Sequence, residues 1–250
     1  MVRGFTYTAL ILRLRPSGES NREIWFLTAE EGILRATVFG GPKSRLRAHA
    51  APFHSGRLWI YHDPVRDSRK VTDFDVRSGR PGIRERYERS MAAAAVAETI
   101  LAGHGGGGNW NEALALADGT LDVLEGAAEG ACVRVFIHFL WRWAELLGVR
   151  PELNRCASGA CEVPADGILW YSRREGALFC PSCAEADLSP GDPLPVGPGA
   201  RRWLAKAGDL PPAPAARYTL DEAAFRQAKA LVTSALAGAL GKRPASWDGW

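Results

Sequence analysis

Four of the five cysteines in this chain of 250 residues form two short pairs. Cys156 and Cys161 are separated by four residues, Cys180 and Cys183 by two, and eighteen residues lie between the pairs. Two loops that each offer two thiolates to one point are what tetrahedral Zn²⁺ requires. The intervening segments GILWYS, RREG and ALFC predict a β-hairpin that brings the pairs together. The spacing therefore predicts a zinc-ribbon or knuckle element at about residues 150–187, with a metal-free cluster and an iron–sulfur centre as alternatives.

A zinc ion at this site is predicted to be structural. Four thiolates fill the tetrahedron and leave no coordination position for water or substrate. The zinc-deaminase signature needs His-x-Glu ahead of Pro-Cys-x-x-Cys. Here Pro181 follows Cys180, and His138 is not followed by the required glutamate. Cys132, the fifth cysteine, lies in an apolar helical segment and is predicted to be a core residue.

The first 80 residues predict a β-barrel. Short apolar or β-branched runs with partial alternation recur between turn residues, at 5–14, 22–29, 33–39, 57–62 and 70–76. A longer connection, GGPKSRLRAHAAPFHSG, separates the third run from the fourth. Five strands with a long connection or short helix at this point predict an OB-type barrel, and an SH3-like barrel is the close competitor.

From residue 82 the pattern becomes helical. The predicted helices lie at 83–103, 110–127, 129–148, 200–208 and 219–241. The last one starts with a capping box from Thr219 to Glu222. The segment SPGDPLPVGPG is predicted to be a linker, and the tail KRPASWDGW to be loosely held. The fold class is therefore α+β, with an OB-type barrel at 1–80 and a helical domain at 81–250 that contains the four-cysteine zinc-finger-like element.

The helix predicted at 129–148 is apolar over most of its surface. Its polar residues Arg134, His138, Arg142 and Glu145 recur at i, i+4, i+8 and i+11, which predicts one narrow exposed stripe on a central helix.

Charge is unevenly distributed along the chain. Residues 1–80 contain 14 lysines and arginines against 8 acidic residues, a net charge of +6, whereas the remainder is at −3. A basic barrel predicts a polyanionic partner, and a solvated basic face is the alternative. No apolar run is long enough to span a membrane, and FTYTALIL is interrupted by Arg13 and Arg15 without a cleavage site after it. The cytoplasm, where thiols stay reduced, is therefore the expected location.

No catalytic residue is predicted. The five histidines lie in unrelated settings, without a neighbouring nucleophile or a second ligand at metal spacing. The run GHGGGGN follows a helix and lacks the Lys-Ser/Thr of a P-loop, so a flexible turn is favoured. Glu30 and Glu31 lie in a turn and are predicted to be solvated.

Binding to a phosphate backbone is the favoured activity. Lys43, Arg45 and Arg47 alternate on a glycine-preceded connection, which can place several cations along a backbone. Trp25, Phe39, Trp59 and Tyr61 could stack bases as in other OB barrels, although core positions are favoured for most of them. The predicted DNA-binding residues are Arg13, Arg15, Arg35, Lys43, Arg45, Arg47, Arg69 and Lys70.

The order of segments resembles the RecO family of bacterial recombination mediators. YTALILR is followed by GILRATVFGGPKSR, then APF, then a helical body with two cysteine pairs, so that the resemblance covers most of residues 5–185. It implies an N-terminal OB-fold and a helical domain with an embedded zinc-finger-like element. The family's glycine-basic loop corresponds to Gly40 to Arg47. Its zinc ligands correspond to Cys156, Cys161, Cys180 and Cys183.

The resemblance also implies a role without bond-breaking chemistry. Such a protein binds single- and double-stranded DNA of the nucleoid, anneals complementary strands, and acts with RecR to help RecA replace single-strand-binding protein during DNA repair. The acidic C-terminal tail of single-strand-binding protein is expected on the helical domain, and Arg134 and Arg142 are the candidates for it, with an ordinary solvated stripe as the alternative. An RNA-binding or transcription-associated module and a zinc hydrolase are the competing functions.

Overall fold

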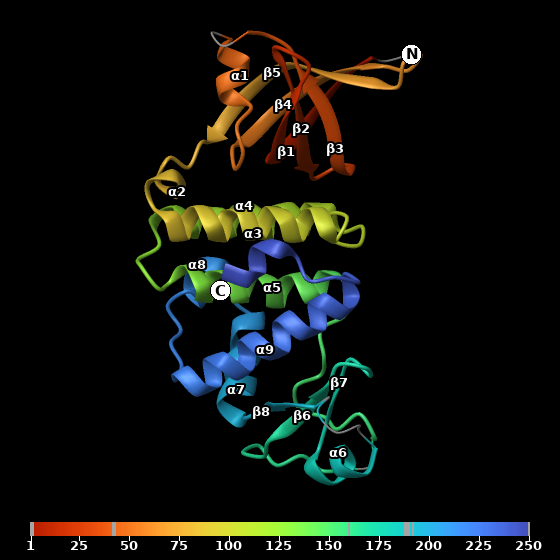
Figure 1. Ribbon diagram of the computed structural model, residues 1–250, viewed down its shortest axis with the longest axis vertical. Coiled ribbons are helices and arrows are strands. Elements are labelled where there is room, and N and C mark those ends of the chain that lie inside the picture. The colour runs from red at the N-terminus through yellow and green to blue at the C-terminus, as the bar shows by residue number, and fades with distance from the viewer. Residues whose placement is uncertain (1–2, 42–43, 160, 188–190, 192, 250) are drawn as a thin grey trace. The chain divides into compact units, whose positions relative to one another are not determined.

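The computed structural model describes residues 3–41, 44–159, 161–187, 191 and 193–249 of the chain. It divides into two compact units, Met1–Cys132 and Val133–Asp248. Figure 1 shows the barrel and the first helices in red to yellow-green, and the later helices with a small sheet in green to blue.

The first unit begins with a closed five-stranded barrel in the order β1-β2-β3-β5-β4. Neighbouring strands are antiparallel except β3 and β5, which are parallel and pair at Thr37 and Lys70. The predicted OB-type barrel and the α+β class are confirmed. The strands are β1 (Gly4–Ser17), β2 (Asn21–Thr28), β3 (Gly32–Val38), β4 (Ser55–Asp63) and β5 (Ser68–Ser78).

A bulge in β1 decides which side chains enter the barrel. Alternation places Tyr7 and Ile11 in the barrel core. The register against β2 then shifts between Ile11 and Arg13, so one extra residue lies between two regular pairs. Beyond the bulge Leu14 packs on the core, whereas Arg13 and Arg15 are exposed. Without the extra residue, the same alternation would direct the two arginines into the core.

Helices cover one outer part of the barrel wall. Leu10 and Leu27 pair across β1 and β2, are fully buried, and are not among the barrel-core residues. Contacts of α3 (Tyr87–Ala102) with β1, and of α4 (Trp110–Gly126) with β1 and β2, account for this burial. The outer side of the strands is therefore apolar where helices cover it and cationic where they do not.

The helix predicted at 83–103 is divided in two. A short α2 (Gly82–Glu85) precedes α3, and Arg86 between them has an extended backbone with φ −132° and ψ 133°. The Ser90 hydroxyl donates to the Ile83 carbonyl oxygen at 2.7 Å and so supplies a partner at the break. The prediction of one continuous helix was wrong, because a side chain satisfies the backbone group that the break leaves open.

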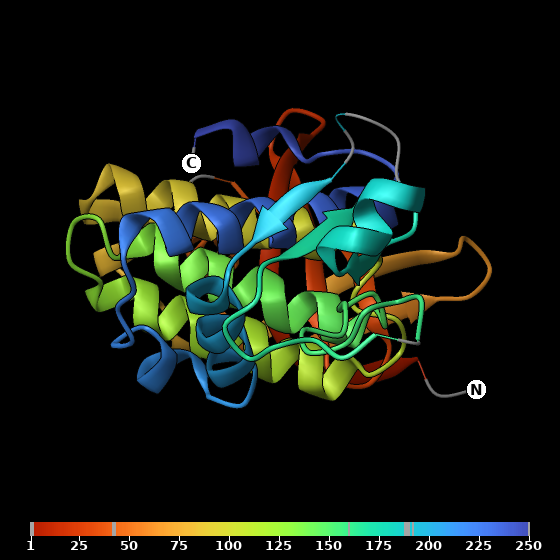
Figure 2. The ribbon, with the colours of Figure 1, turned by 90° about the horizontal axis from the view of Figure 1, so that it is seen from below.

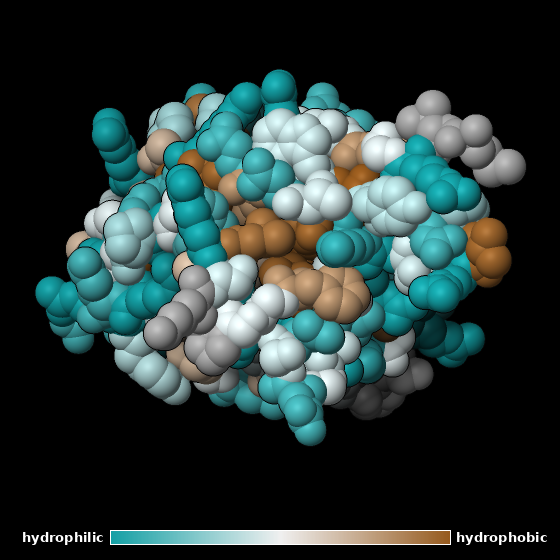
Figure 3. All heavy atoms as spheres, turned by 90° about the horizontal axis from the view of Figure 1, so that it is seen from above, coloured by the Kyte–Doolittle hydropathy of each residue, from teal (hydrophilic) through white to brown (hydrophobic). Residues whose placement is uncertain are grey.

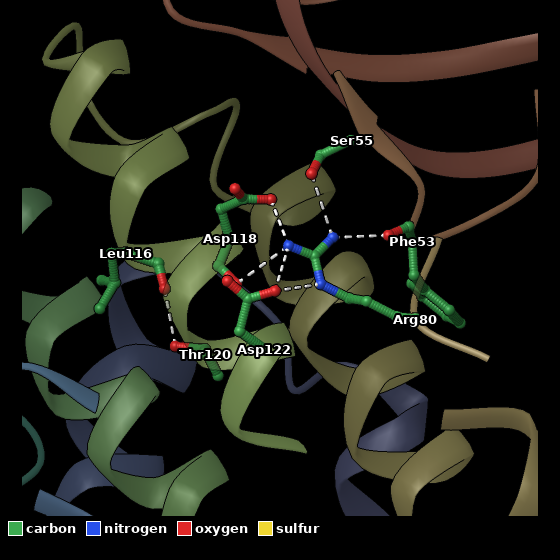
Figure 4. A network of polar contacts seen from close by, with 7 residues as sticks. All are labelled: Phe53, Ser55, Arg80, Leu116, Asp118, Thr120 and Asp122. Atoms are coloured by element: carbon green, nitrogen blue, oxygen red, sulfur yellow. Dashed lines mark hydrogen bonds and ion pairs between the residues drawn. The ribbon is translucent and has the colours of Figure 1, made fainter. Parts of the chain in front are cut away.

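A buried guanidinium connects the barrel to α4 (Figure 4). The side chain of Arg80 is fully buried. Its Nε donates to Asp122 Oδ1 at 2.7 Å, and its Nη2 donates to Asp118 Oδ1 at 2.6 Å. Its Nη1 donates to the Phe53 carbonyl oxygen at 2.7 Å and to Ser55 Oγ at 3.3 Å. One side chain thus ties the end of β5 to the start of β4 and to two successive turns of α4.

The second unit is built around α5 (Cys132–Leu146). The rings of Phe139 and Trp143 stack with centroids 5.4 Å apart, and Trp247 meets Phe136 edge to face at 6.3 Å. Trp247 is 1% exposed, so the prediction of a loosely held tail was wrong. The other helical elements are α6 (Pro181–Asp187), α7 (Pro198–Gly208), α8 (Pro212–Ala215), α9 (Glu222–Ala239) and the 3₁₀ helix η1 (Ala245–Gly249).

The start of α9 differs from its prediction. Asp221 is the N-cap, and its carboxylate accepts from the Ala224 backbone N–H at 2.8 Å. The predicted capping box placed this role at Thr219, two residues earlier. Both residues are good N-caps by type, and the structure selects the aspartate.

A three-stranded antiparallel sheet in the order β7-β6-β8 belongs to the second unit. β6 (Leu169–Ser172) and β7 (Ala177–Phe179) form the predicted hairpin around the turn 173–176. β8 (Leu194–Val196) pairs with the other edge of β6, as Figure 2 shows for the light-blue and teal arrows. The segment SPGDPLPVGPG was predicted to be a linker, and its described part instead contains this strand.

The predicted exposed stripe on α5 is interrupted at its centre, because His138 is buried while Arg134 and Arg142 are half-buried and Glu145 is exposed. His138 is 1% exposed, and its Nε2 lies 3.0 Å from the carbonyl oxygens of both Ala207 and Leu210. Burial lowers the pKa of His138 to about 4. Arg134 and Arg142 are half-buried, and Arg142 pairs with Glu145 at 3.1 Å. None of the described helices is long and apolar enough to cross a membrane.

Candidate metal cluster and basic barrel surface

The two cysteine pairs meet in the second unit. One sulfur from each of Cys156, Cys161, Cys180 and Cys183 forms a group whose members all lie within 4.8 Å of one another. Four sulfurs about 2.3 Å from a tetrahedral zinc ion are about 3.8 Å apart. The four cysteines are therefore positioned to bind a metal ion. No other group of three or more potential ligands is found among the described residues.

The hairpin positions the two loops of the cluster. The Ala157 N–H donates to the Leu178 carbonyl oxygen at 2.8 Å, which attaches the first cysteine loop to β7. The Cys180 N–H donates to Cys156 Sγ at 3.4 Å, as backbone groups do around bound thiolates. The Ser182 hydroxyl and the Cys183 backbone N–H lower the pKa of Cys180 to about 6. A hydrogen bond with Cys183 is the main cause that raises the pKa of Cys161 to about 12.

Cys132 does not belong to this cluster. It is 1% exposed, in line with its prediction as a core residue. Burial raises the pKa of its thiol, which keeps the side chain neutral and unreactive.

Cationic and aromatic side chains form a row across the barrel wall. Arg13 on β1 and Arg35 on β3 are the register partners of Trp25 on β2, so the three lie side by side on neighbouring strands. Both arginines are exposed and the indole is half-buried. The guanidinium carbons of Arg13 and Arg15 lie 5.9 and 5.3 Å from the Trp25 ring centroid. This row presents two kinds of group that bind single-stranded nucleic acid, cations and a flat ring.

The connection after β3 contains a short helix, which is one of the two forms predicted for it, but the helix places the cations differently from the prediction. It contains the helix α1 (Arg45–His49), whose N-cap Ser44 accepts from the Arg47 N–H at 3.4 Å. Two residues span about 200° around a helix, so Arg45 and Arg47 point away from each other instead of lining one extended loop. Arg45 is exposed, whereas Arg47 is half-buried and donates to the Ser20 carbonyl oxygen at 3.2 Å. Lys43 lies outside the described residues.

The remaining predicted cations lie on β5. Lys70 is exposed with its Nζ 5.3 Å from the Phe39 ring centroid, and Arg69 is half-buried. Figure 3 shows hydrophobic side chains at the centre of the barrel face, surrounded by hydrophilic ones. Phe39 is 47% and Tyr61 37% exposed. Core positions were expected for most of Trp25, Phe39, Trp59 and Tyr61, and this expectation was wrong, because none of the four is in the barrel core.

The two acidic residues in the β2–β3 turn are exposed, as predicted, and both also accept hydrogen bonds from β1. Glu31 Oε1 accepts from the Tyr7 hydroxyl at 2.8 Å, and Glu30 Oε1 accepts from the Thr8 N–H at 3.1 Å. Burial and the Glu31 carboxylate raise the pKa of Tyr7 to about 12. The turn is therefore fixed against β1.

Arg80 is one of the 14 cationic residues of the barrel segment, and its side chain is fully buried. Its acceptors Asp118 and Asp122 received no role. Their i, i+4 spacing on a helix was the available signal, since it places both carboxylates on one face.

The fold and the cluster define a class of protein: an OB-type barrel joined to a helical region with four cysteines arranged for a metal ion. The chain belongs to the RecO family. Residues 1–79 match the family model for the N-terminal part of recombination protein O, and residues 84–248 match the model for its C-terminal part.

Relatives matched over most of their length agree with the family models. The DNA repair protein RecO of Rubrobacter xylanophilus is 30% identical, with 92% of this chain and 91% of the relative covered. The protein of the same name from Anaeromyxobacter sp. (strain K) is also 30% identical, with 96% of this chain and 92% of the relative covered.

Proposed function

We propose that this chain is a recombination mediator in DNA repair that binds single- and double-stranded DNA and anneals complementary strands. With RecR, it helps load RecA onto DNA coated with single-strand-binding protein, whose C-terminal tail binds the helical domain. The observation that supports this best is the Arg13–Trp25–Arg35 row on an OB-type barrel in a RecO-family chain. The protein acts in the cytoplasm on nucleoid DNA and has no bond-breaking activity.

We propose that the chain has two domains. Residues 1–80 form the nucleic-acid-binding domain and residues 81–250 the helical domain, with the zinc element at about 150–187. The strands end at Ser78 and the first following helix begins at Gly82, which supports this boundary.

We propose Zn²⁺ as the metal of the cysteine cluster, held by Cys156, Cys161, Cys180 and Cys183. Four thiolates at this spacing suit zinc, and they leave no position for a substrate. When bound, the ion supplies a crosslink between the two cysteine loops, and the hairpin holds those loops in place.

The cations of the barrel bind phosphates without reading bases. Each phosphate contact on a single strand contributes a slope of about −0.7 to the dependence of log K on log salt. Replacing Arg15 and Arg35 by glutamine is therefore expected to flatten the slope by about 1.4 for any sequence. Arg202→Gln with Arg226→Gln is a matched control, because both arginines are exposed in the second unit and the charge change is the same. A change of sequence preference in the barrel variant would contradict backbone binding.

The proposed function is tested by annealing of two complementary oligonucleotides, each coated with single-strand-binding protein from the same organism and without added nucleotide. We expect faster annealing without strand cleavage in the presence of the protein. No acceleration by a folded, zinc-loaded sample would refute the mediator function. Tighter binding to RNA than to matched DNA would favour the RNA-binding module, because the 2′-hydroxyl distinguishes the two.

A further inference from the structure

A hollow of about 490 Å³ adjoins the cationic row where the turn between α3 and α4 meets the barrel. Arg13, Trp25 and Arg35 line it from the barrel, and Trp110, the first residue of α4, lines it from the helices. Ile33 and Leu101 add apolar side chains to the wall of the hollow. Two indoles and two guanidinium groups from separate segments therefore surround one space.

Glycines at two positions allow the two sides to approach each other. Gly32 has φ +72°, and a Cβ at this position would lie 2.8 Å from Trp110 Nε1. Gly105, in the glycine-rich turn, has φ +84°, and a Cβ there would lie 3.2 Å from Ile33 Cγ1. Both backbones favour glycine, and both sites lack space for a side chain. The glycine-rich run therefore packs against the barrel and positions the Trp110 indole at the hollow.

We propose that this hollow binds one unpaired nucleotide of single-stranded DNA. Its base lies against the indoles of Trp25 and Trp110, and its flanking phosphates are bound by Arg13 and Arg35. The proposal rests on the proposed DNA-binding function and names the subsite that distinguishes a single strand from a duplex.

The composition of the hollow favours a nucleotide over a phosphate group alone. A phosphate site needs cations and backbone N–H groups, and the apolar side chains and two indoles in this space would not serve it. Glu31 also lines the hollow, and its carboxylate is held by the Tyr7 hydroxyl. A fixed negative charge repels phosphate and tolerates the polar edge of a base.

The arginines beside Trp25 do not prevent base stacking. Arg13 and Arg15 are exposed, and an exposed cation–π contact contributes less free energy than stacking of a base on an indole. A base can therefore displace a guanidinium group from the ring, and the displaced group is then available to a neighbouring phosphate. A paired base cannot do the same without first being unstacked from its duplex.

The experiment compares two labelled oligonucleotides of equal length by fluorescence anisotropy with the full chain. One is oligo-dT, and the other has the same phosphates on abasic spacers. Trp25→Ala is expected to weaken oligo-dT binding about tenfold and abasic binding less than twofold, because only the former loses stacking. Trp25→Phe should restore most of the oligo-dT affinity. Trp170→Ala, at a half-buried position on β6 of the second unit, should change neither.

Trp110→Ala should repeat the Trp25→Ala pattern if its circular dichroism spectrum matches the wild type. Equal loss of affinity for both oligonucleotides in Trp25→Ala, or no loss, would overturn the subsite while leaving DNA binding intact. Failure of the wild type to bind either oligonucleotide would instead refute the DNA-binding function itself. Tighter binding of oligo-rU than oligo-dT with the same dependence on Trp25 would reassign the hollow to RNA.

Discussion

The buried Arg80 guanidinium provides a sharp test of how the first unit is held together. Arg80→Ala removes the hydrogen bonds to the Phe53 carbonyl oxygen and to the carboxylates of Asp118 and Asp122. Removing one partner of a buried ion pair typically costs about 3–5 kcal/mol. The aspartate side chains are 38% and 54% exposed, so water can hydrate them once the cation is gone. We therefore expect the lower end of that range, about 3 kcal/mol.

The backbone at Arg80 separates two contributions to this loss. Arg80 has φ 44°, in the left-handed region that costs a residue with a side chain about 1 kcal/mol relative to glycine. Arg80→Gly removes the same side-chain contacts as Arg80→Ala but relieves this cost. It is therefore expected to be about 1 kcal/mol more stable than Arg80→Ala. Arg80→Lys keeps the charge but loses the forked geometry, so its loss should be smaller than that of Arg80→Ala.

Urea unfolding followed by hydrogen exchange measures this loss locally. Peptides from β4 and from α4 report on the first unit in the full chain, and peptides from α9 report on the second unit. Arg57→Ala is the matched control, because Arg57 is an exposed arginine on β4 and its loss should stay within about 0.5 kcal/mol. If Arg80→Ala also stayed within about 0.5 kcal/mol, the buried ionic network would not hold β4 and α4 together.

Two further predictions concern the second unit. Removal of the proposed ion by a chelator, or the substitution Cys183→Ser, is expected to raise hydrogen exchange in β6 and β7 and to leave the barrel peptides protected, because the ion crosslinks the two cysteine loops. If β6 and β7 stayed protected while an activity was lost, a zinc hydrolase would be favoured instead. His138 is neutral when folded with a pKa of about 4, below its unfolded value, so its contribution to stability is complete above about pH 6.5 and is lost as pH falls towards 4. The free energy of unfolding is expected to fall by about 3 kcal/mol over this pH range. In His138→Gln, urea unfolding should depend less on pH between about 6.5 and 4.

Sequence patterns within short segments predicted the strands, helices and cysteine cluster that depend on neighbouring residues. Alternation located all five barrel strands, because one face of each strand had to fill the barrel. The cysteine spacing predicted a compact four-sulfur cluster, because short loops on a hairpin leave few other arrangements. In the second unit α5, α7 and α9 were located to within a few residues, whereas the short helices α6 and α8 were not predicted.

The features that escaped prediction depend on partners distant in sequence. β8 has three residues and is a strand only because β6 offers it an unpaired edge. The stripe on α5 has helical spacing, yet His138 is buried because α7 supplies a carbonyl acceptor. The hollow beside Trp25 depends on where Trp110 is placed, and that depends on two glycines packing against other segments. No window of sequence contains these pairs.

Because of the bulge in β1, the requirements on side chains before the bulge differ from those after it. Before the bulge, Leu10 packs on the outer side of the strand under the helices and Ile11 packs in the barrel core. A substitution at either residue therefore disturbs a packed layer. In the second half only the inward side is constrained, as by Leu14. The outward positions of Arg13 and Arg15 are free to vary without unseating α3 or α4. Substitutions at these two positions can therefore change the affinity for a polyanion and leave the packing of the helices unchanged. Both the cationic positions and the helix-contacting residues lie on β1.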